Sequence, residues 1–372
     1  MALSLLVIQP TPFCNIDCDY CYLASRTDRS RMTMDTLRMA LDRVLSAELV
    51  EHELSIVWHA GEPLTLPVEY YAEAFAVIEK ARPPKLAIHH SIQSNGMLLN
   101  ERWCRFIREH RINIGLSIDG PAWLHDRHRK TRRGQGTHAC SMAGLELLRS
   151  QEIPFHVIAV LTRESLGHAD EIFDFFLDQG VRQLCFNIEE IEAINANSSL
   201  SGVGVEVEFR GFIERILARL RECHGSMGIR EIEDVFKALR HPDFGTFAAN
   251  SQNSPFEIIN IAHDGQFSTF SPELLGINFA GYGSFTFGNV HKDEINAIIN
   301  NANFQRAAHD IAEGVSSCHI SCKYFPFCRG GAPSNKLAEL GTFTGTETMY
   351  CRLTQKILIE CVLSAIESEL MD

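Results

Sequence analysis

The sequence lacks long hydrophobic runs, an excess of basic residues and a processing signal. No apolar stretch approaches the ~18 residues that span a membrane, and residues 1–8 have neither the basic flank nor the cleavage site of a signal peptide. Lys and Arg number 34 against 47 Asp and Glu, so the net charge is −13. Binding to nucleic acid needs clustered positive charge. We therefore expect a cytoplasmic protein that binds neither nucleic acid nor membrane.

A regular alternation of strand-like and helix-like segments fills the first 223 residues. Six strand–helix units predict a parallel sheet with helical crossovers. No glycine-rich nucleotide-binding segment follows the first strand, so we expect an α/β fold of the partial (β/α)6 TIM barrel type, with its chemistry at the carboxyl ends of the strands. The expected strands are Leu5–Gln9, Leu54–Trp58, Leu86–Gln93, Ile112–Ile118, Phe155–Leu161 and Gln183–Ile188. The expected helices are Met34–Leu49, Val68–Lys80, Glu101–Glu109, Ala139–Ser150, His168–Gln179 and Glu206–Cys223.

The alternation ends near residue 225, where Gly, Ser, Asn and Pro become frequent over residues 225–254. We predict a domain boundary there, with the barrel in residues 1–224 and a bridging region plus a C-terminal lobe in residues 225–372. Because the chain opens directly on the first strand, we expect no separate recognition domain before the barrel. The lobe is expected to contain strands at Glu257–Ala262 and Gly265–Phe270 and a final helix at Tyr350–Leu370.

Twelve cysteines are the most informative part of the composition. Disulfides are rare in the cytoplasm, so this number points to metal binding or catalysis. Seven cysteines form two groups, Cys14, Cys18 and Cys21 in one loop and Cys318, Cys322, Cys328 and Cys351 near the C-terminus. The other five are expected to be small buried hydrophobic residues: Cys104, Cys140, Cys185, Cys223 and Cys361.

The first group has the spacing Cys-x3-Cys-x2-Cys and directly follows the first expected strand. Three thiolates can hold a 4Fe–4S cluster and leave one iron free for a substrate or cofactor. A structural zinc site closes with four ligands, so the alternative is a zinc loop that His59 or His90 completes.

On this spacing, with Tyr20 before the third cysteine, the chain resembles the radical S-adenosylmethionine (radical SAM) superfamily. The segment Ala60–Pro63 resembles the family's G-G-E-P segment with Ala in place of the first Gly, and Gln93–Gly96 resembles its Q-x-N-G segment. The resemblance implies that the free iron binds the amino and carboxylate groups of SAM, and that the reduced cluster cleaves SAM to a 5′-deoxyadenosyl radical.

The resemblance also assigns a SAM pocket to the strand ends. Glu62 would accept hydrogen bonds from the SAM ammonium, Ser117 would contact the ribose, and Leu161 would border the adenine through its backbone. Asp119 and Arg127 each have two readings, a cofactor contact or an ion pair that fixes the loop. The implied SAM-binding residues are Tyr20, Ala60, Gly61, Glu62, Pro63, Gln93, Ser94, Asn95, Ser117, Asp119 and Leu161.

The second group offers four soft ligands, which fit either a closed zinc site or a fully ligated iron–sulfur cluster. Beside a radical SAM core it resembles the SPASM domain, which binds auxiliary 4Fe–4S clusters. The full pattern has seven cysteines and two auxiliary clusters, but here Phe270 and Ala332 stand where ligands of the inner cluster would be. We therefore expect two 4Fe–4S clusters per chain, one that binds SAM and one auxiliary.

The segments Cys328–Lys336 and Gly345–Leu353 resemble a narrower group, the GrrM-like maturases of glycine-rich-repeat precursors and relatives that form three-residue cyclophanes. This implies a ribosomal precursor peptide as partner, an external one-electron reductant, and a bond between an aromatic ring and a Cβ atom. The alternatives are a thioether bond or formylglycine generation, and the missing inner-cluster ligands argue against the latter. A zinc-stabilised scaffold without catalysis is the alternative from another class.

Such a net oxidation also releases a proton, so a base is needed. The candidates are Glu189 and Glu190 after the sixth strand, and Asp264 and Glu273 in the lobe, each of which could instead be a solvated or paired carboxylate. The basic stretch Arg127–Arg133 is either a docking surface for an acidic leader peptide or, as we prefer, a solvated loop.

Overall fold

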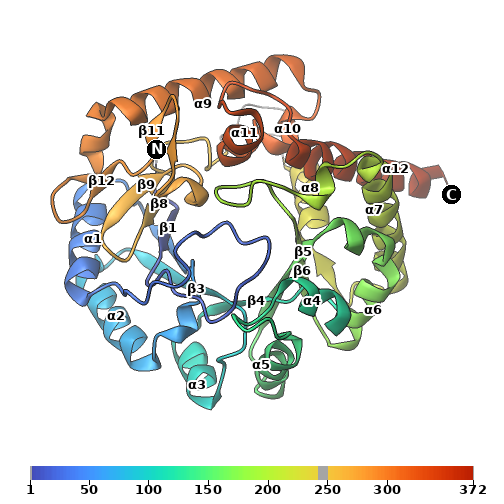
Figure 1. Cartoon of the computed structure of the whole chain (residues 1–372), viewed down its shortest axis with the longest axis horizontal. Helices are drawn as coiled ribbons and strands as arrows, with labels where there is room; N and C mark the ends of the chain where they lie inside the picture. Colours follow the sequence, from blue (N-terminus) through green and yellow to red (C-terminus); the bar gives the residue numbers. More distant parts are fainter. Residues whose placement is uncertain (1, 242–249, 372) are drawn as a thin grey trace.

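A computed structural model describes residues 2–241 and 250–371, and its centre is a parallel sheet (Figure 1). The six strands that the sequence predicts are present and pair in chain order, each parallel to the next. This confirms the α/β fold of the partial (β/α)6 barrel type. The strands are β1 (Leu5–Ile8), β2 (Glu53–Trp58), β3 (Ala87–Ser94), β4 (Asn113–Ser117), β5 (Phe155–Leu161) and β6 (Gln183–Ile188).

Helices cover the outer face of this sheet, as Figure 1 shows. Local capping sets several of their starts: Thr33 accepts a hydrogen bond from the backbone of Thr36, and Asn100 accepts two from the first turn of its helix. The helices are α1 (Met34–Ser46), α2 (Val68–Ala81), α3 (Glu101–His110), α4 (Ala122–His128), α5 (His138–Ser150), α6 (Ala169–Asp178) and α7 (Val205–Glu222). Short 3-10 turns lie at η1 (Pro63–Thr65), η2 (Arg163–Gly167) and η3 (Ser199–Ser201).

Each strand divides its side chains between the helices and the inside of the barrel. On β5, Val157, Ala159 and Leu161 are fully buried, whereas Ile158 and Val160 line an interior cavity. Successive side chains of a strand point to opposite faces, so the first set packs against the helices. Whether a side chain of the strand faces the cavity or the helices therefore depends only on its place in this alternation.

The sheet continues across the predicted domain boundary at residue 225. β7 (Gly228–Ile229) pairs with β6, and β8 (Ile258–Ile261) pairs in parallel with β1. The division at residue 225 stays a prediction, and residues 242–249 of the bridging region lie outside the described residues. The further elements here are α8 (Arg230–Arg240), β9 (Gln266–Thr269), β12 (Gly288–Asn289), and the separate pair β10 (Asn278–Phe279) and β11 (Gly283–Ser284).

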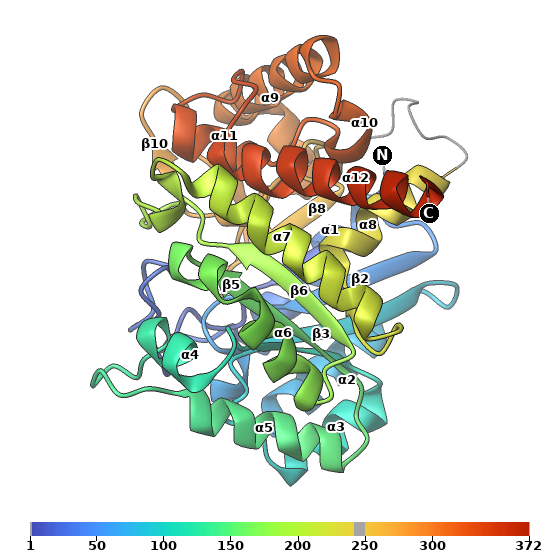
Figure 2. The same cartoon turned by 90° about the vertical axis from the view of Figure 1, so that its right-hand side faces the viewer.

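The C-terminal helices stack on one side of the barrel, away from α3 and α5 (Figure 2). The expected final helix begins as a π-helical segment and becomes α-helical only at Leu358. Within the described residues, no helix combines the length and the apolar character that crossing a membrane requires. The elements are η4 (Pro272–Leu274), η5 (Ile295–Asn300), α9 (Ala302–Ser321), α10 (Phe325–Cys328), α11 (Pro333–Leu340), η6 (Cys351–Ile357) and α12 (Leu358–Met371).

Candidate active site

The loop between β1 and α1 carries the first three cysteines and lies across the centre of the barrel in Figure 1. Cys14, Cys18 and Cys21 all line an interior cavity of about 270 Å³, which we call the barrel cavity. Backbone contacts hold the loop: the amide of Cys14 donates to the carbonyl of Arg26 at 3.1 Å, and Arg132 donates to the carbonyl of Cys14 at 2.9 Å. The three thiols therefore converge as the spacing predicts.

The turn after β2 packs closely against this loop. A Cβ atom at Gly61 would lie 2.5 Å from the carbonyl oxygen of Thr11 and 2.6 Å from that of Phe13, so only glycine lets the loop approach. Ala60 is buried with φ +71°, a conformation that costs a non-glycine residue energy. Ala60 and Pro63 do not line the cavity and shape the turn instead.

Glu62 is the buried acid of the barrel cavity, with only 2% of its surface exposed. Its carboxylate accepts hydrogen bonds from the amide of Leu64 at 2.9 Å, the hydroxyl of Ser94 at 2.8 Å and the amide of Asn95 at 2.8 Å. Burial raises the pKa of Glu62 to about 7, because these neutral donors do not fully replace water. In the described part of the chain no basic side chain pairs with it, so a bound ammonium group would complete its surroundings.

Polar residues at the ends of β3 and β4 continue the wall. Gln93, Asn95 and Ser117 line the cavity, and Gln93 donates to the hydroxyl of Ser117 at 3.0 Å. Asn95 donates to Asn15 at 2.8 Å and thus ties the strand end to the cysteine loop. Ser94 does not line the cavity and positions Glu62 instead.

The side chain of Leu161 packs in the core and not in the cavity wall, and its carbonyl accepts the amide of Glu189 at 2.8 Å. Ile158 and Val160 are the strand-five side chains that line the cavity, because the strand alternation turns even-numbered residues inward here. A backbone contact of Leu161 with adenine stays a prediction.

Asp119 is fully buried and forms a two-pronged ion pair with Arg129, with both contacts at 3.0 Å. It also accepts hydrogen bonds from the hydroxyl of Tyr20 and the amide of Val160. Burial alone would raise the pKa of Asp119, but the guanidinium of Arg129 lowers it. Of its two expected roles the structure shows the ion pair, with Arg129 as partner, and Asp119 does not line the cavity.

Three arginines of the basic stretch are therefore already paired within the protein. Arg129 is buried against Asp119, Arg132 holds the cysteine loop, and Arg127 pairs with Glu164. Sequence reasoning had singled out the stretch but missed the site roles of Arg129 and Arg132. A leader-docking role for the stretch stays a prediction.

Three acids form another part of the cavity wall. Glu190 and Glu273, both expected as candidate bases, line the barrel cavity together with Glu192, which sequence reasoning missed although it lies two residues after Glu190. Burial raises the pKa of Glu190 to about 7 and raises the pKa of Glu192 and Glu273 as well. Asn335 donates to Glu190 at 2.6 Å, and no basic side chain pairs with the three acids within the described ranges.

The other two candidate bases differ from these. Glu189 lines the cavity, but its carboxylate accepts the amide of Ser199 at 2.8 Å. Asp264 is exposed, bonds to Gln266 at 2.7 Å and lies outside the cavity. It therefore drops out as a candidate base.

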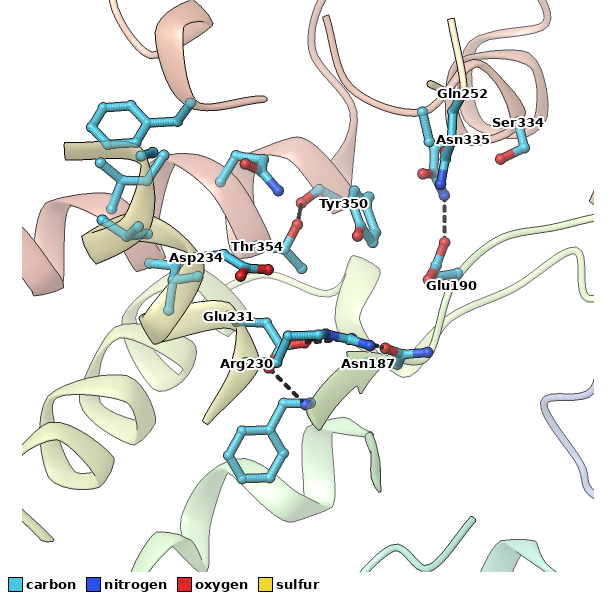
Figure 3. Close-up of a pocket in the computed structure, with 18 of the residues that line it drawn as sticks. Asn187, Glu190, Arg230, Glu231, Asp234, Gln252, Ser334, Asn335, Tyr350 and Thr354 are labelled. Atoms are coloured by element: carbon cyan, nitrogen blue, oxygen red, sulfur yellow. Dashed lines mark hydrogen bonds and ion pairs between the residues drawn. The ribbon is translucent and has the colours of Figure 1, made fainter. Parts of the chain in front are cut away.

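A second cavity, of about 420 Å³, adjoins the barrel cavity and is shown in Figure 3. We call it the middle cavity; it shares Asn187 and the three acids with the barrel cavity. Arg230 lines this cavity and donates to Asn187 at 2.8 Å and to Glu231 at 2.8 Å. Tyr350 and Thr354 line its other side (Figure 3).

A third cavity, of about 250 Å³, is lined by all four cysteines of the second group. We call it the lobe cavity. It shares Ala332, Tyr350 and Gln355 with the middle cavity, so the three cavities form a series from the first cysteine group to the second.

Neither cysteine group has the geometry of a zinc site. Tetrahedral zinc holds its sulfur ligands ~3.8 Å apart. In the described part of the chain, which includes every cysteine, three or more His, Cys, Asp or Glu ligand atoms lie within 4.8 Å of one another only at exposed His309 and Glu313 with half-buried Asp310. His90 stacks on Phe75 with a centroid distance of 4.0 Å and does not line the barrel cavity, whereas His59 lines it and lies 3.4 Å from the hydroxyl of Tyr22.

The thiols are farther apart than zinc requires, and each group offers sulfur ligands only. Both features fit a 4Fe–4S cluster, in which each cysteine binds a different iron. Burial raises the pKa of Cys14 and of Cys351 to about 12, so a cationic metal centre is needed to keep these sulfurs as thiolates. The remaining cysteines follow expectation in part. Cys104, Cys185 and Cys361 are buried and Cys223 is half-buried, whereas Cys140 is exposed.

Comparisons with known proteins agree with this geometry. The family model described as the radical SAM superfamily matches residues 8–176. An uncharacterized protein from Synechocystis sp. is 43% identical over 371 residues, which cover 99% of this chain and 93% of that protein. A serine-type anaerobic sulfatase-maturating enzyme from Klebsiella aerogenes is 35% identical over 177 residues, which span only 47% of this chain and 44% of that enzyme.

A solved structure of native anSMEcpe with bound AdoMet and the Cp18Cys peptide superposes with a TM-score of 0.79 at 19% identity. The match covers 99% of this chain and 98% of that one. At this identity the likeness is one of fold, and it includes the C-terminal lobe as well as the barrel.

Proposed function

The chain belongs to the radical SAM superfamily, and we propose that it modifies a ribosomal precursor peptide by joining an aromatic ring to a Cβ atom. The observation that carries this proposal is the series of three cavities, which places a substrate-sized space between two cysteine groups. A peptide segment in the middle cavity would meet SAM chemistry at one end and an electron acceptor at the other.

The barrel cavity supplies the residues for SAM. Cys14, Cys18 and Cys21 would hold the 4Fe–4S cluster that the family implies, and Glu62 would receive the SAM ammonium as a charge-assisted contact. The hydroxyl of Tyr20 donates to Asp119, which is itself fixed by its ion pair with Arg129. The ring of Tyr20 is thereby held in the cavity wall. When bound and reduced, cluster and SAM supply the carbon radical that removes a hydrogen atom from the peptide.

The acids between the barrel and middle cavities are suited to take up the proton that ring substitution releases. Addition of a Cβ radical to an aromatic ring leaves one electron and one proton to be removed before aromaticity returns. Glu190 is the best placed, since it lines both cavities and Asn335 orients it. Its raised pKa suits a group that exchanges a proton near neutral pH.

The lobe cavity would hold a single auxiliary 4Fe–4S cluster on Cys318, Cys322, Cys328 and Cys351, in a SPASM-like lobe formed by residues 225–372. Phe270, where an inner-cluster ligand would stand, is fully buried and stacks on Phe304 at 5.8 Å. Aromatic packing instead of sulfur there supports two clusters per chain in all. The auxiliary cluster would take the electron from the ring and pass it to an external one-electron carrier.

The comparisons support a peptide partner and also favour a second candidate function. The anSMEcpe structure contains a peptide, and the Klebsiella relative is a sulfatase-maturating enzyme. Formylglycine generation is therefore the runner-up, on the strength of sequence identity that is confined to about half of the chain. The thioether outcome has no such support.

Mass spectrometry of a precursor peptide modified by anaerobically reconstituted enzyme, with SAM and dithionite, tests the proposal. The expected product has lost two hydrogens and resists fragmentation between an aromatic residue and a downstream neighbour. Formylglycine made from Ser has the same mass loss, so a hydrazide probe for aldehydes is the necessary second readout. An aldehyde, or a cross-link on a Cys sulfur, contradicts the ring-to-Cβ proposal, and the variant with Cys14, Cys18 and Cys21 changed to Ala is the blank.

A further inference from the structure

Lys336 is a buried lysine in the lobe cavity. It lies on α11, is only 4% exposed, and its Nζ is 3.5 Å from the Sγ of Cys318. Within the described residues no carboxylate forms an ion pair with it. A buried ammonium without a carboxylate is costly unless another negative charge compensates it, and thiolate sulfur is the nearest candidate.

The fold makes room for this side chain. At Gly314 on α9, a Cβ atom would lie 3.1 Å from Nζ of Lys336 and 2.1 Å from the carbonyl oxygen of Phe343. Glycine there lets α9 pass close and leaves space for the ammonium group. The preceding residue, Asn335, donates to Glu190, so two consecutive residues of α11 serve different cavities.

We propose that Lys336 raises the reduction potential of the cluster held by the four lobe cysteines, an inference that rests on the auxiliary cluster of the proposed function. Four thiolates give such a cluster net negative charge, and the electron taken from the peptide adds one more. A fixed cation at a ligand sulfur stabilises the reduced form more than the oxidised form, because the interaction is strong where water is excluded. The electron then leaves to the external carrier.

Two other lysines border the same cavity and serve as natural comparisons. Lys356 is paired with Glu347, and Lys323 is exposed beside the ring of Tyr324. Pairing or solvent reduces the field that each exerts on the sulfurs. Lys336 alone of these three is both buried and without a carboxylate partner.

The test is a potentiometric titration of the holoenzyme followed by electron paramagnetic resonance, with SAM added to mark the signal of the first cluster. Lys336→Met should lower the midpoint potential of the second cluster and leave that of the first unchanged, Lys336→Arg should restore it, and Lys356→Met should shift the second midpoint by less than Lys336→Met does, because Lys356 is paired with Glu347. An unchanged midpoint in Lys336→Met at full iron content would overturn the proposal. Wild-type protein with only about four irons would instead contradict the auxiliary cluster itself.

A second measurement covers variants that fail to load iron. Wild-type holoenzyme grown with 15N-lysine should show a 15N coupling to the reduced second cluster by electron–nuclear double resonance. Lys356→Met should retain that coupling. Its absence from the wild-type spectrum would refute a contact between Lys336 and the cluster, whatever the variants do.

Discussion

The two cysteine groups are built in opposite ways. Cys14, Cys18 and Cys21 lie on a long loop that arginines and backbone contacts hold in place, and they face an open cavity. The four lobe cysteines lie at or near helix ends and surround a smaller cavity with a lysine in its wall. Three ligands on a loop leave a coordination position for a cofactor, whereas four on helices close the site.

The difference shows how one chain can separate two tasks of an oxidation. The loop site has a buried acid, Glu62, with room for a cation beside it. The lobe site has a buried cation, Lys336, beside its own sulfurs. Under the proposed function, one end of the cavity series would bind a positively charged cofactor and the other would accept negative charge.

Removal of the loop group should have the largest effect. In the variant with Cys14, Cys18 and Cys21 changed to Ala, formation of 5′-deoxyadenosine from SAM and dithionite should cease. Iron should fall from about eight to about four atoms per chain, since the lobe group is untouched. Deoxyadenosine assayed by chromatography and iron by colorimetry check this, and persistent deoxyadenosine would mean that SAM binds elsewhere.

Removal of the lobe group should separate the two tasks. Changing Cys322 and Cys351 to Ala should also leave about four irons, but SAM cleavage should continue while the peptide product is lost. The reason is that the loop group and the Glu62 turn contain none of these residues. If SAM cleavage stops as well, in a variant that stays folded by circular dichroism, the two sites are not independent.

The acid wall between the two groups gives a pH test. Burial raises the pKa of Glu190 to about 7, so product formation should rise with pH through that value as the carboxylate forms. Glu190→Gln should reduce the rate by roughly 100-fold or more and remove this limb. Glu192, Glu273 and Glu339 face the same group, so Glu189→Gln, outside this coupled set, is the matched control.

The carboxyl group of Glu190 should affect folding stability in the opposite sense: stability should fall, not rise, as the pH increases. The folded protein keeps the proton of Glu190 up to about pH 7, whereas the unfolded chain loses it near the ordinary value of 4.5. Its contribution is therefore present below pH 4.5 and lost as pH rises through 7. Thermal unfolding should accordingly be less sensitive to pH between 4.5 and 7 in Glu190→Gln than in the wild type.

A smaller effect is expected at Glu62. Glu62→Gln keeps the size and some hydrogen bonds but removes the charge that meets the SAM ammonium, a contact of about 1.5–3 kcal/mol. The affinity for SAM should fall by roughly 10–100-fold while both clusters load fully. Equilibrium dialysis with labelled SAM measures this, and an unchanged affinity at full iron content would exclude the ammonium contact.

The smallest effect distinguishes two neighbouring arginines. Arg132 donates to the carbonyl of Cys14, whereas the side chain of exposed Arg133 forms no hydrogen bond within the described ranges. Arg132→Gln should weaken the loop by about 1 kcal/mol and speed loss of its iron to a chelator, and Arg133→Gln should not. Equal rates of iron loss in the two variants would show that the loop does not depend on Arg132. If both variants instead lost affinity for the precursor peptide equally, that result would support the docking role of the basic stretch.

Sequence reasoning reached the elements and the cysteine groups because their signals are local. Period and spacing predicted every end of the six strands to within one residue, and each cysteine group lies within one stretch of sequence, residues 14–21 and 318–351. The sequence did not show which side chains of strand five line the cavity, because choosing the face of a strand requires knowing which alternate side chains the helices cover. Ile158 and Val160 face inward for that reason alone.

Other features depend on pairs that are distant or ambiguous in sequence. Asp119 had two arginines within ten residues, and only the folded loop selects Arg129 over Arg127. The link between Asn335 and Glu190 spans 145 residues, and no local pattern announces it. Lys336 reads as an ordinary surface residue until α9 and α11 enclose it.

The pairing of β8 with β1 has a consequence for the order of events during synthesis. Leu5 and Ile258 are register partners, so the first strand remains an open edge until some 250 further residues have left the ribosome. At ~5–20 residues per second that takes roughly 12–50 s. The edge of β1 that β8 covers therefore closes long after Asn95 and Arg132, which hold the first cysteine loop, have been made, and the second cysteine group follows later still.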